Sequence, residues 1–298
     1  MGQFQAADDL ADFSLPRLTT MRTIFALLVI ATPALATDPV VHRDLAYAEP
    51  KNEQQTLDIY APADGENHPV VVWIHGGGRA TGQKAGVQKK PQVFVDKGFV
   101  FVSINYRFVP QVTMKGMMGD VAKAIRWVHD HAVEYGGDPN TIIVMGHSGG
   151  AHLAALVCTD DRYLKAENLS LANIKACVPV DVGFYDVLKQ VKDSGSVAPD
   201  SFKAFFGGTE ESMRDMSPVA HIAKGKDIPS FLILYVADRP NTKAQSLWFA
   251  GKLKEAGISA ISVAAEGKTH DTINSDLGTP DDKPTQALWE FLEGMLKK

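Results

Sequence analysis

The sequence predicts an α/β fold in which a mostly parallel sheet is covered by helices on both faces. Two observations carry this prediction. Apolar runs of strand length alternate along the chain with segments of helical periodicity, which is typical of parallel sheets. A serine-containing G-x-S-x-G turn at 146–150 joins one such run directly to a helical segment. At 298 residues, with 45% hydrophobic and 22% charged residues, the chain suits one large domain of this class.

The predicted strands are short apolar runs bounded by turn residues. The alternating segment 57–60 is typical of an edge strand, and the run 70–74 is typical of a central strand. Further strands are expected at 99–104, 141–145, 174–180, 231–236 and 259–263. Pro179 has no backbone donor, which favours a strand end there.

The predicted helices follow from apolar spacing. The segment 121–135 carries Val121, Ile125 and Val128 on one face, and 151–157 contains no helix breaker. A further helix is expected at 242–256. The last helix has five apolar residues at the spacing of a core-facing stripe, namely Leu288, Phe291, Leu292, Met295 and Leu296.

The N-terminal region has the pattern of a secretory signal peptide. Arg22 precedes an apolar run at 24–31, and an A-x-A cleavage pattern ends at Ala36. Residues 1–20 are acidic instead of basic, so we expect translation to begin at Met21 or the first twenty residues to reflect start-site assignment. The alternative is an N-terminal helix, packed or loose. Export to the periplasm or the exterior is expected, with the cytoplasm as the alternative location.

Bulk composition excludes several classes of function. A net charge of −5 and the lack of a basic run argue against nucleic-acid binding, and the N-terminal apolar run is too short for a stable membrane span. Cys158 and Cys177 lie in apolar stretches and are interpreted as buried free thiols, although an oxidising compartment would permit one disulfide. No metal or organic cofactor is expected, and the sequence does not indicate an oligomeric state.

The turn around Ser148 has the sequence context of a nucleophile elbow. It directly follows the strand run at 141–145 and directly precedes the helix at 151–157. Gly146 and Gly150 leave room for a tight turn that a β-carbon would block. The turn exposes the serine hydroxyl at a helix N-terminus, where developing negative charge is favoured. A plain glycine-rich turn with a serine cap is the alternative.

A second glycine motif makes chance coincidence a poor explanation. His75-Gly76-Gly77-Gly78 follows the strand run at 70–74 at once. Glycines in such a position let a substrate carbonyl approach backbone N–H groups, as an oxyanion hole requires.

With these two motifs, the chain resembles the α/β-hydrolase superfamily, and within it the HGGG-containing esterases related to hormone-sensitive lipase, bacterial carboxylesterases and arylformamidases. The resemblance runs from about Leu57 to the C-terminus and includes the segments 105–107 and 135–139. It implies an α/β-hydrolase domain over 41–298, with a short cap at 183–228; surface helices packed on the sheet are the alternative there. The chain departs from such esterases at Arg79, where an aromatic is common, and at Gly149, where alanine is common.

In this fold the catalytic order is serine, acid, histidine. His270 follows the last predicted strand and is the expected base for Ser148. Asp238, after the strand at 231–236, is the expected acid, and Asp181, one strand earlier, is the alternative.

The remaining expected site residues bind the substrate. The oxyanion hole is expected to comprise the N–H groups of Gly77, Gly78 and Gly149. Arg79 and Tyr185 are candidate substrate-binding residues, and an arginine at 79 could meet a carboxylate. The resemblance implies a serine carboxylesterase acting on small or short-chain esters. An arylformamidase-type amidase with the same triad is the alternative, and a non-catalytic binding protein of this fold is the alternative from another class.

Overall fold

The computed structural model describes Met1 and residues 38–77, 81–193, 202 and 205–297. The expected signal peptide at 21–36 lies outside the described residues. Clustering of contacts separates the chain into two units, and every helix and strand named below belongs to the unit Ala36–Lys298.

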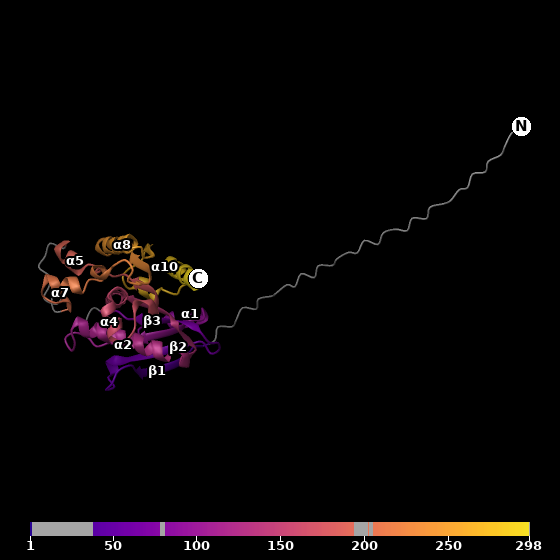
Figure 1. Ribbon diagram of the computed structural model, residues 1–298, viewed down its shortest axis with the longest axis horizontal. Coiled ribbons are helices and arrows are strands. Elements are labelled where there is room, and N and C mark those ends of the chain that lie inside the picture. The colour runs from indigo at the N-terminus through magenta and orange to yellow at the C-terminus, as the bar shows by residue number, and fades with distance from the viewer. Residues whose placement is uncertain (2–37, 78–80, 194–201, 203–204, 298) are drawn as a thin grey trace. The chain divides into compact units, whose positions relative to one another are not determined.

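An eight-stranded sheet organises this unit, with the strand order β1-β2-β4-β3-β5-β6-β7-β8. Figure 1 shows the sheet together with the helices that surround it. The strands are β1 (Val40–Ala46), β2 (Thr56–Ala61), β3 (His68–Ile74), β4 (Val100–Ile104), β5 (Gly137–His147), β6 (Ile174–Val180), β7 (Ser230–Val236) and β8 (Ala260–Ala265). β1 and β4 pair antiparallel with β2. All other neighbouring strands are parallel, so the predicted fold class is confirmed.

Helices cover both faces of the sheet. They are α1 (Lys90–Asp96), α2 (Met114–His131), α3 (Gly149–Val157), α4 (Asp161–Ala166), α5 (Val187–Asp193), α7 (Glu210–Asp215), α8 (Pro240–Glu255), α9 (Thr272–Ser275) and α10 (Lys283–Leu296). Alternate side chains of β3 enter two different hydrophobic clusters. Val70 and Val72 belong to the cluster that includes residues of α2, α3 and α8, whereas Trp73 belongs to the cluster that includes residues of α1, α9 and α10. This alternation is the two-residue period of a strand buried on both sides.

Two expectations about the sheet and the last helix need correction. The segment 57–60 is not an edge strand, because β2 lies between β1 and β4. The edge strand is β1, whose exposed residues include Arg43 and Asp44. Charged residues are common on edge strands because they discourage pairing with other chains, and here they hide the strand from a search for apolar runs. In α10, Leu288 and Leu292 are buried as expected, but Leu296 is 42% exposed.

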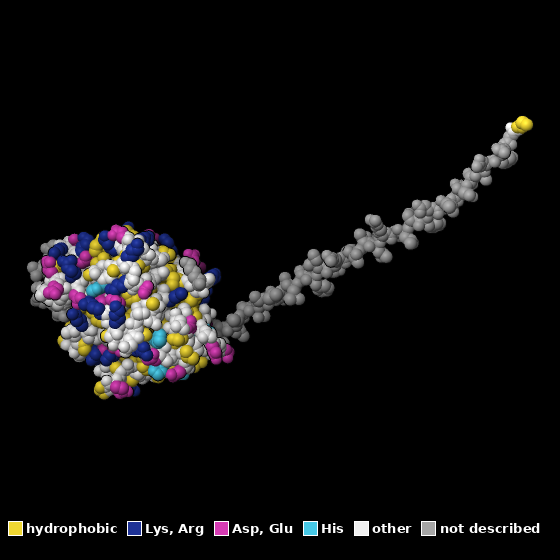
Figure 2. Space-filling model, viewed as in Figure 1, with side chains coloured by type: hydrophobic (Ala, Val, Ile, Leu, Met, Phe, Trp, Pro, Cys, Tyr) yellow, Lys and Arg dark blue, Asp and Glu magenta, His cyan; other side chains and the backbone are white. Residues whose placement is uncertain are grey.

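The surface and the cysteines are unremarkable for a globular domain. On the face shown in Figure 2, basic and acidic side chains are interspersed. No helix among the described residues has the length and apolarity to cross a membrane. Cys158 and Cys177 are both buried free thiols.

Candidate active site

Ser148 occupies a sharp turn between β5 and α3. Its backbone angles are φ 55° and ψ −120°, a strained conformation of the kind that clusters at functional sites. A β-carbon on Gly146 would lie 2.4 Å from the carbonyl oxygen of Gly150, and one on Gly150 would lie 2.0 Å from that of Ile74. Only glycine fits at these two positions, so the turn depends on both.

The structure brings Ser148 and His270 together. His270 lies in the loop that follows β8, and its Nε2 is 2.9 Å from Ser148 Oγ. On the other side of the ring, His270 Nδ1 is 2.6 Å from Asp181 Oδ2. Asp181 directly follows β6. A serine hydroxyl, a histidine ring and a buried carboxylate therefore form one hydrogen-bonded chain, an arrangement that can activate a serine as a nucleophile.

The expected contact between Asp238 and His270 does not occur in the structure. Asp238 is exposed in the turn after β7, and the carboxylate at His270 is that of Asp181. The backbone of β7 explains the difference. It holds Asp181 through a hydrogen bond from Asp181 N–H to Leu234 O (2.7 Å) and another from Val236 N–H to Asp181 Oδ1 (2.9 Å).

Asp181 is fully buried and remains an anion. Burial alone would raise its pKa, but the hydrogen bonds with His270 and Val236 and the nearby Arg239 guanidinium together lower the pKa below the ordinary aspartate value. Arg239 is the residue that sequence reasoning missed. Arg239 directly follows Asp238 in the turn after a parallel strand. Ligands of open α/β sheets bind at the carboxyl ends of such strands, so this position could have marked Arg239 as a candidate site residue.

The expected oxyanion loop is described only in part. Gly77 has φ +150°, and a β-carbon there would lie 1.5 Å from the carbonyl oxygen of Thr81, so the position requires glycine. Gly149 is the first residue of α3 and has open space around its α-carbon. Gly77 and Ser148 line the same cavity. Gly78 and Arg79 lie outside the described residues.

Two cavities meet at Ser148. One, of about 130 Å³, has a wall of Phe184, Phe205 and Phe206 together with Arg239. The other, of about 500 Å³, is lined by the glycine loop and by His270. Tyr185 is a core residue instead of the expected substrate contact, because its fully buried ring stacks on Phe249 at 4.3 Å between ring centroids. Its neighbour Phe184 faces the smaller cavity.

Three buried histidines surround the serine turn. The His147 ring lies tilted against the His270 ring with 4.5 Å between ring centroids. His147 Nε2 is 2.8 Å from the His270 carbonyl oxygen, which helps to hold the loop of His270. His75 lies behind the glycine loop, and His152 lies one helical turn after Ser148. Burial is the main cause that lowers the pKa of each to about 4, so all three are neutral at pH 7.

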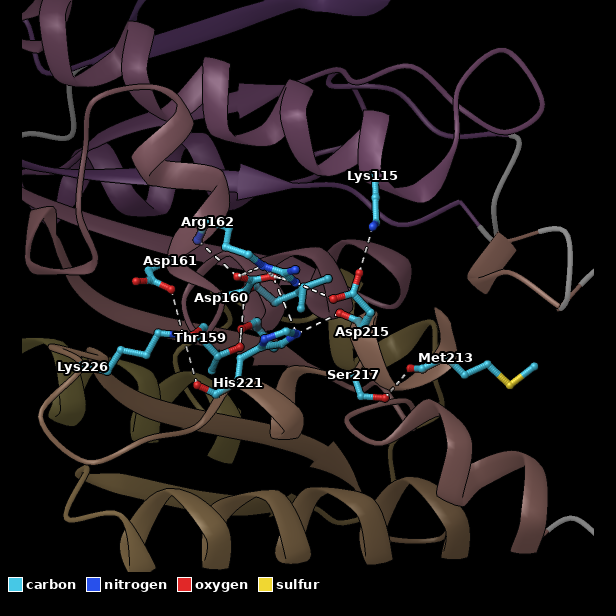
Figure 3. A network of polar contacts seen from close by, with 12 residues as sticks. Lys115, Thr159, Asp160, Asp161, Arg162, Met213, Asp215, Ser217, His221 and Lys226 are labelled. Atoms are coloured by element: carbon cyan, nitrogen blue, oxygen red, sulfur yellow. Dashed lines mark hydrogen bonds and ion pairs between the residues drawn. The ribbon is translucent and has the colours of Figure 1, made fainter. Parts of the chain in front are cut away.

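A polar network anchors the segment that supplies the aromatic wall (Figure 3). Asp215 in α7 binds Arg162 of α4 at 2.7 Å and Lys115 of α2 at 3.1 Å. Arg162 also forms a bidentate pair with the buried Asp160. A third cavity of about 570 Å³ lies beside this network and shares Phe205 and Phe206 with the smaller cavity at Ser148. None of the three residues of the Ser148 hydrogen-bonded chain lines it.

The chain was compared with known proteins. The BD-FAE family model matches residues 57–253. The probable isoprenylcysteine alpha-carbonyl methylesterase ICMEL1 of Arabidopsis thaliana is 32% identical over 78% of this chain and 51% of its own length. Esterase LipQ of Mycobacterium tuberculosis is 28% identical over 84% of this chain and 61% of its own length. The chain thus spans about half to three fifths of these two curated relatives.

Solved structures with the same fold include two esterases. The butyrate-bound Est2 esterase from Thermogutta terrifontis superposes with a TM-score of 0.67 at 27% identity, covering 86% of this chain and 93% of that one. Esterase B from Lactobacillus rhamnosis superposes with a TM-score of 0.73 at 18% identity, covering 87% of this chain and 88% of that one. At the lower identity, the likeness shows the fold alone.

Proposed function

The chain belongs to the BD-FAE family, and on that basis we propose that it is a serine carboxylester hydrolase acting on small or short-chain esters. The observation that carries the proposal is the continuous hydrogen-bonded chain from Ser148 through His270 to Asp181, with separations of 2.9 and 2.6 Å. The small aromatic-walled cavity of about 130 Å³ is well below the volume of a drug-sized pocket, which favours a short acyl group. The butyrate bound to the Thermogutta esterase supports the same substrate size.

The geometry supports a two-step reaction. His270 Nε2 takes the Ser148 proton as Oγ bonds to the ester carbonyl carbon, and the carbonyl electron pair moves onto oxygen. Backbone N–H groups of Gly149 and the glycine loop would stabilise that oxyanion. When the carbonyl re-forms, the bond to the alcohol breaks, and His270 returns the proton to the leaving oxygen. Water then attacks the acyl-enzyme by the same route, releasing the acid and restoring Ser148. Asp181 would hold the ring and offset the charge of the imidazolium.

Covalent labelling tests the nucleophile directly. A fluorophosphonate probe should label the wild-type chain and leave Ser148→Ala unlabelled. Hydrolysis of p-nitrophenyl acetate and butyrate should fall on the order of 10⁴ to 10⁶-fold in kcat in that variant, because triad residues act as a unit. The exposed Ser259→Ala is the matched control and should keep both signals. Label retained by Ser148→Ala would contradict the proposal. Faster turnover of N-formylkynurenine than of any ester would favour the amidase instead.

We also propose that the interval 183–228 acts as a short cap. It contains α5 and α7 and contributes Phe184, Phe205 and Phe206 to the wall of the cavity at Ser148. Phe206→Ala removes an aromatic ring from this wall and so enlarges the cavity. In a series of p-nitrophenyl esters, this variant should hydrolyse esters with longer acyl chains than the wild-type protein does. An unchanged chain-length profile would contradict that role.

Export of the protein is a further proposal, supported by the basic, apolar and A-x-A pattern of residues 21–36. Cleavage after Ala36 would make Thr37 the mature N-terminus. Mass spectrometry of the protein from its native host should find a peptide beginning at Thr37. Abundant intact peptides spanning Leu35 to Val40 would rule export out.

A further inference from the structure

We propose that Arg239 selects esters that carry a carboxylate close to the scissile bond. This inference rests on the proposed ester hydrolysis and adds a substrate class to it. The sheet order places the residue: β7 lies between β6 and β8, and Arg239 caps α8 directly after β7. Its guanidinium therefore reaches Asp181, which follows β6, and His270, which follows β8.

The guanidinium keeps most of its donors available. Arg239 Nη1 binds Asp181 Oδ2 and lies 2.8 Å from His270 Nδ1. Its Nε and Nη2 take part in no side-chain hydrogen bond among the described contacts. The side chain is 42% exposed and lines the smaller cavity together with Ser148. An arginine presents five N–H groups in a planar fork that matches a carboxylate.

Arg239 is the only lysine or arginine among the described lining residues of this cavity, which also include three phenylalanines. Asp181 is the one carboxylate among them, and it already pairs with Arg239 Nη1. A substrate carboxylate placed in this cavity would lose hydrogen bonds to water and gain hydrogen bonds from the guanidinium. The surroundings are partly apolar, so this charged pair would be stronger there than at an open surface.

Arg239 also affects which tautomer the His270 ring adopts. His270 Nδ1 can donate to Asp181 or accept from Arg239, but one nitrogen cannot do both at once. When Nδ1 accepts, the proton of neutral His270 sits on Nε2, and that nitrogen cannot take the proton of Ser148. A substrate carboxylate that engages the guanidinium would draw it from Nδ1 and leave Nδ1–H to Asp181. The same contact would therefore bind the substrate and favour the productive tautomer.

A pair of nearly isosteric esters tests this selection. Monomethyl glutarate carries a carboxylate, and methyl glutaramate replaces it with a neutral amide of similar shape. Hydrolysis followed by pH-stat should give the wild-type protein a kcat/KM preference of about tenfold for the charged ester, the size expected for one partly exposed charged hydrogen-bonded pair. Arg239→Gln should bring the ratio near one, and Arg239→Lys should retain part of it.

The control removes an equal charge elsewhere. Arg126 pairs with Asp130 on the surface of α2, so Arg126→Gln should keep the wild-type ratio. An unchanged ratio in Arg239→Gln would overturn the inference. An equal fold-loss of kcat/KM on both esters in Arg239→Gln would also overturn it, because Arg239 would then only support the Asp181–His270 pair. If the wild-type protein hydrolyses neither ester and the fluorophosphonate leaves Ser148 unlabelled, the proposed function itself fails. If the wild-type protein hydrolyses monomethyl glutarate and methyl glutaramate with equal kcat/KM, only the inference about Arg239 fails.

Discussion

At the residue scale, the choice between two aspartates decides how the base is oriented. Asp181 contacts His270, whereas Asp238 is exposed. We expect Asp181→Asn to lower kcat on the order of 10⁴-fold, because an amide can donate to Nδ1 and stabilise the wrong tautomer. Asp238→Asn is the matched control and should stay within a few-fold of wild type. Steady-state kinetics on p-nitrophenyl acetate measures both, and the reverse pattern would restore Asp238 as the acid.

The sequence predicts Ser148 and His270 as site residues but could not choose between these two aspartates as the partner of His270. Ser148 has a local signature of strand, glycine turn and helix, and His270 is the histidine that follows the last strand. Asp181 and Asp238 each follow an apolar strand, so local pattern treats them alike. The choice depends on hydrogen bonds between Asp181 and the backbone of the neighbouring strand β7. These partners lie 50 residues or more from Asp181 in the sequence, so the residues around Asp181 do not reveal the contact.

At the element scale, the turn between β5 and α3 packs so closely against the end of β3 that one of its glycines has no room for a side chain. A β-carbon at Gly150 would meet the Ile74 carbonyl, whereas one at Gly149 meets no atom within 4 Å. We expect Gly150→Ala to lower the free energy of unfolding by about 1–3 kcal/mol or more, because rigid backbone must move. Gly149→Ala should be neutral or raise it by up to about 1 kcal/mol, since alanine favours a helix. Urea unfolding distinguishes the two, and equal losses would contradict this account.

Strands were predictable from the sequence where their apolar residues follow one another without interruption. β3, β4 and β7 are buried almost throughout, so their sequences are nearly continuous in valine, isoleucine, leucine and phenylalanine. β1 and α1 escaped prediction for opposite reasons. In β1, a central polar stretch that includes Arg43 and Asp44 interrupts the apolar residues. α1 is only seven residues long and begins with the buried Lys90, a residue type that ordinarily indicates a surface.

At the scale of the whole molecule, buried neutral histidines make stability depend on pH. His75, His147 and His152 have pKa values of about 4 in the folded chain, against about 6.5 when unfolded. Above pH 6.5 both states are neutral. As pH falls from 6.5 toward 4, the unfolded chain binds protons first, so stability is lost across that window, by roughly 3 kcal/mol per histidine.

Urea unfolding at pH 7 and pH 5 measures this loss, and His152→Gln should reduce it. The matched control is the exposed Gln286→Ala in α10, which removes no titratable group and should leave the wild-type difference between the two pH values unchanged. The account is wrong if His152→Gln and the wild type lose the same free energy of unfolding between pH 7 and pH 5.

The sequence separation of the site has a consequence for synthesis. Ser148 and His270 are 122 residues apart, and Asp181 and His270 are 89 apart. A nascent chain can complete the serine turn while β8 is still inside the ribosome, and such a chain has a nucleophile without its base. Closing contacts of this length is also among the slowest steps of folding. Under the proposed mechanism, newly made protein would gain hydrolytic activity only after β8 has joined the sheet and His270 lies beside Ser148.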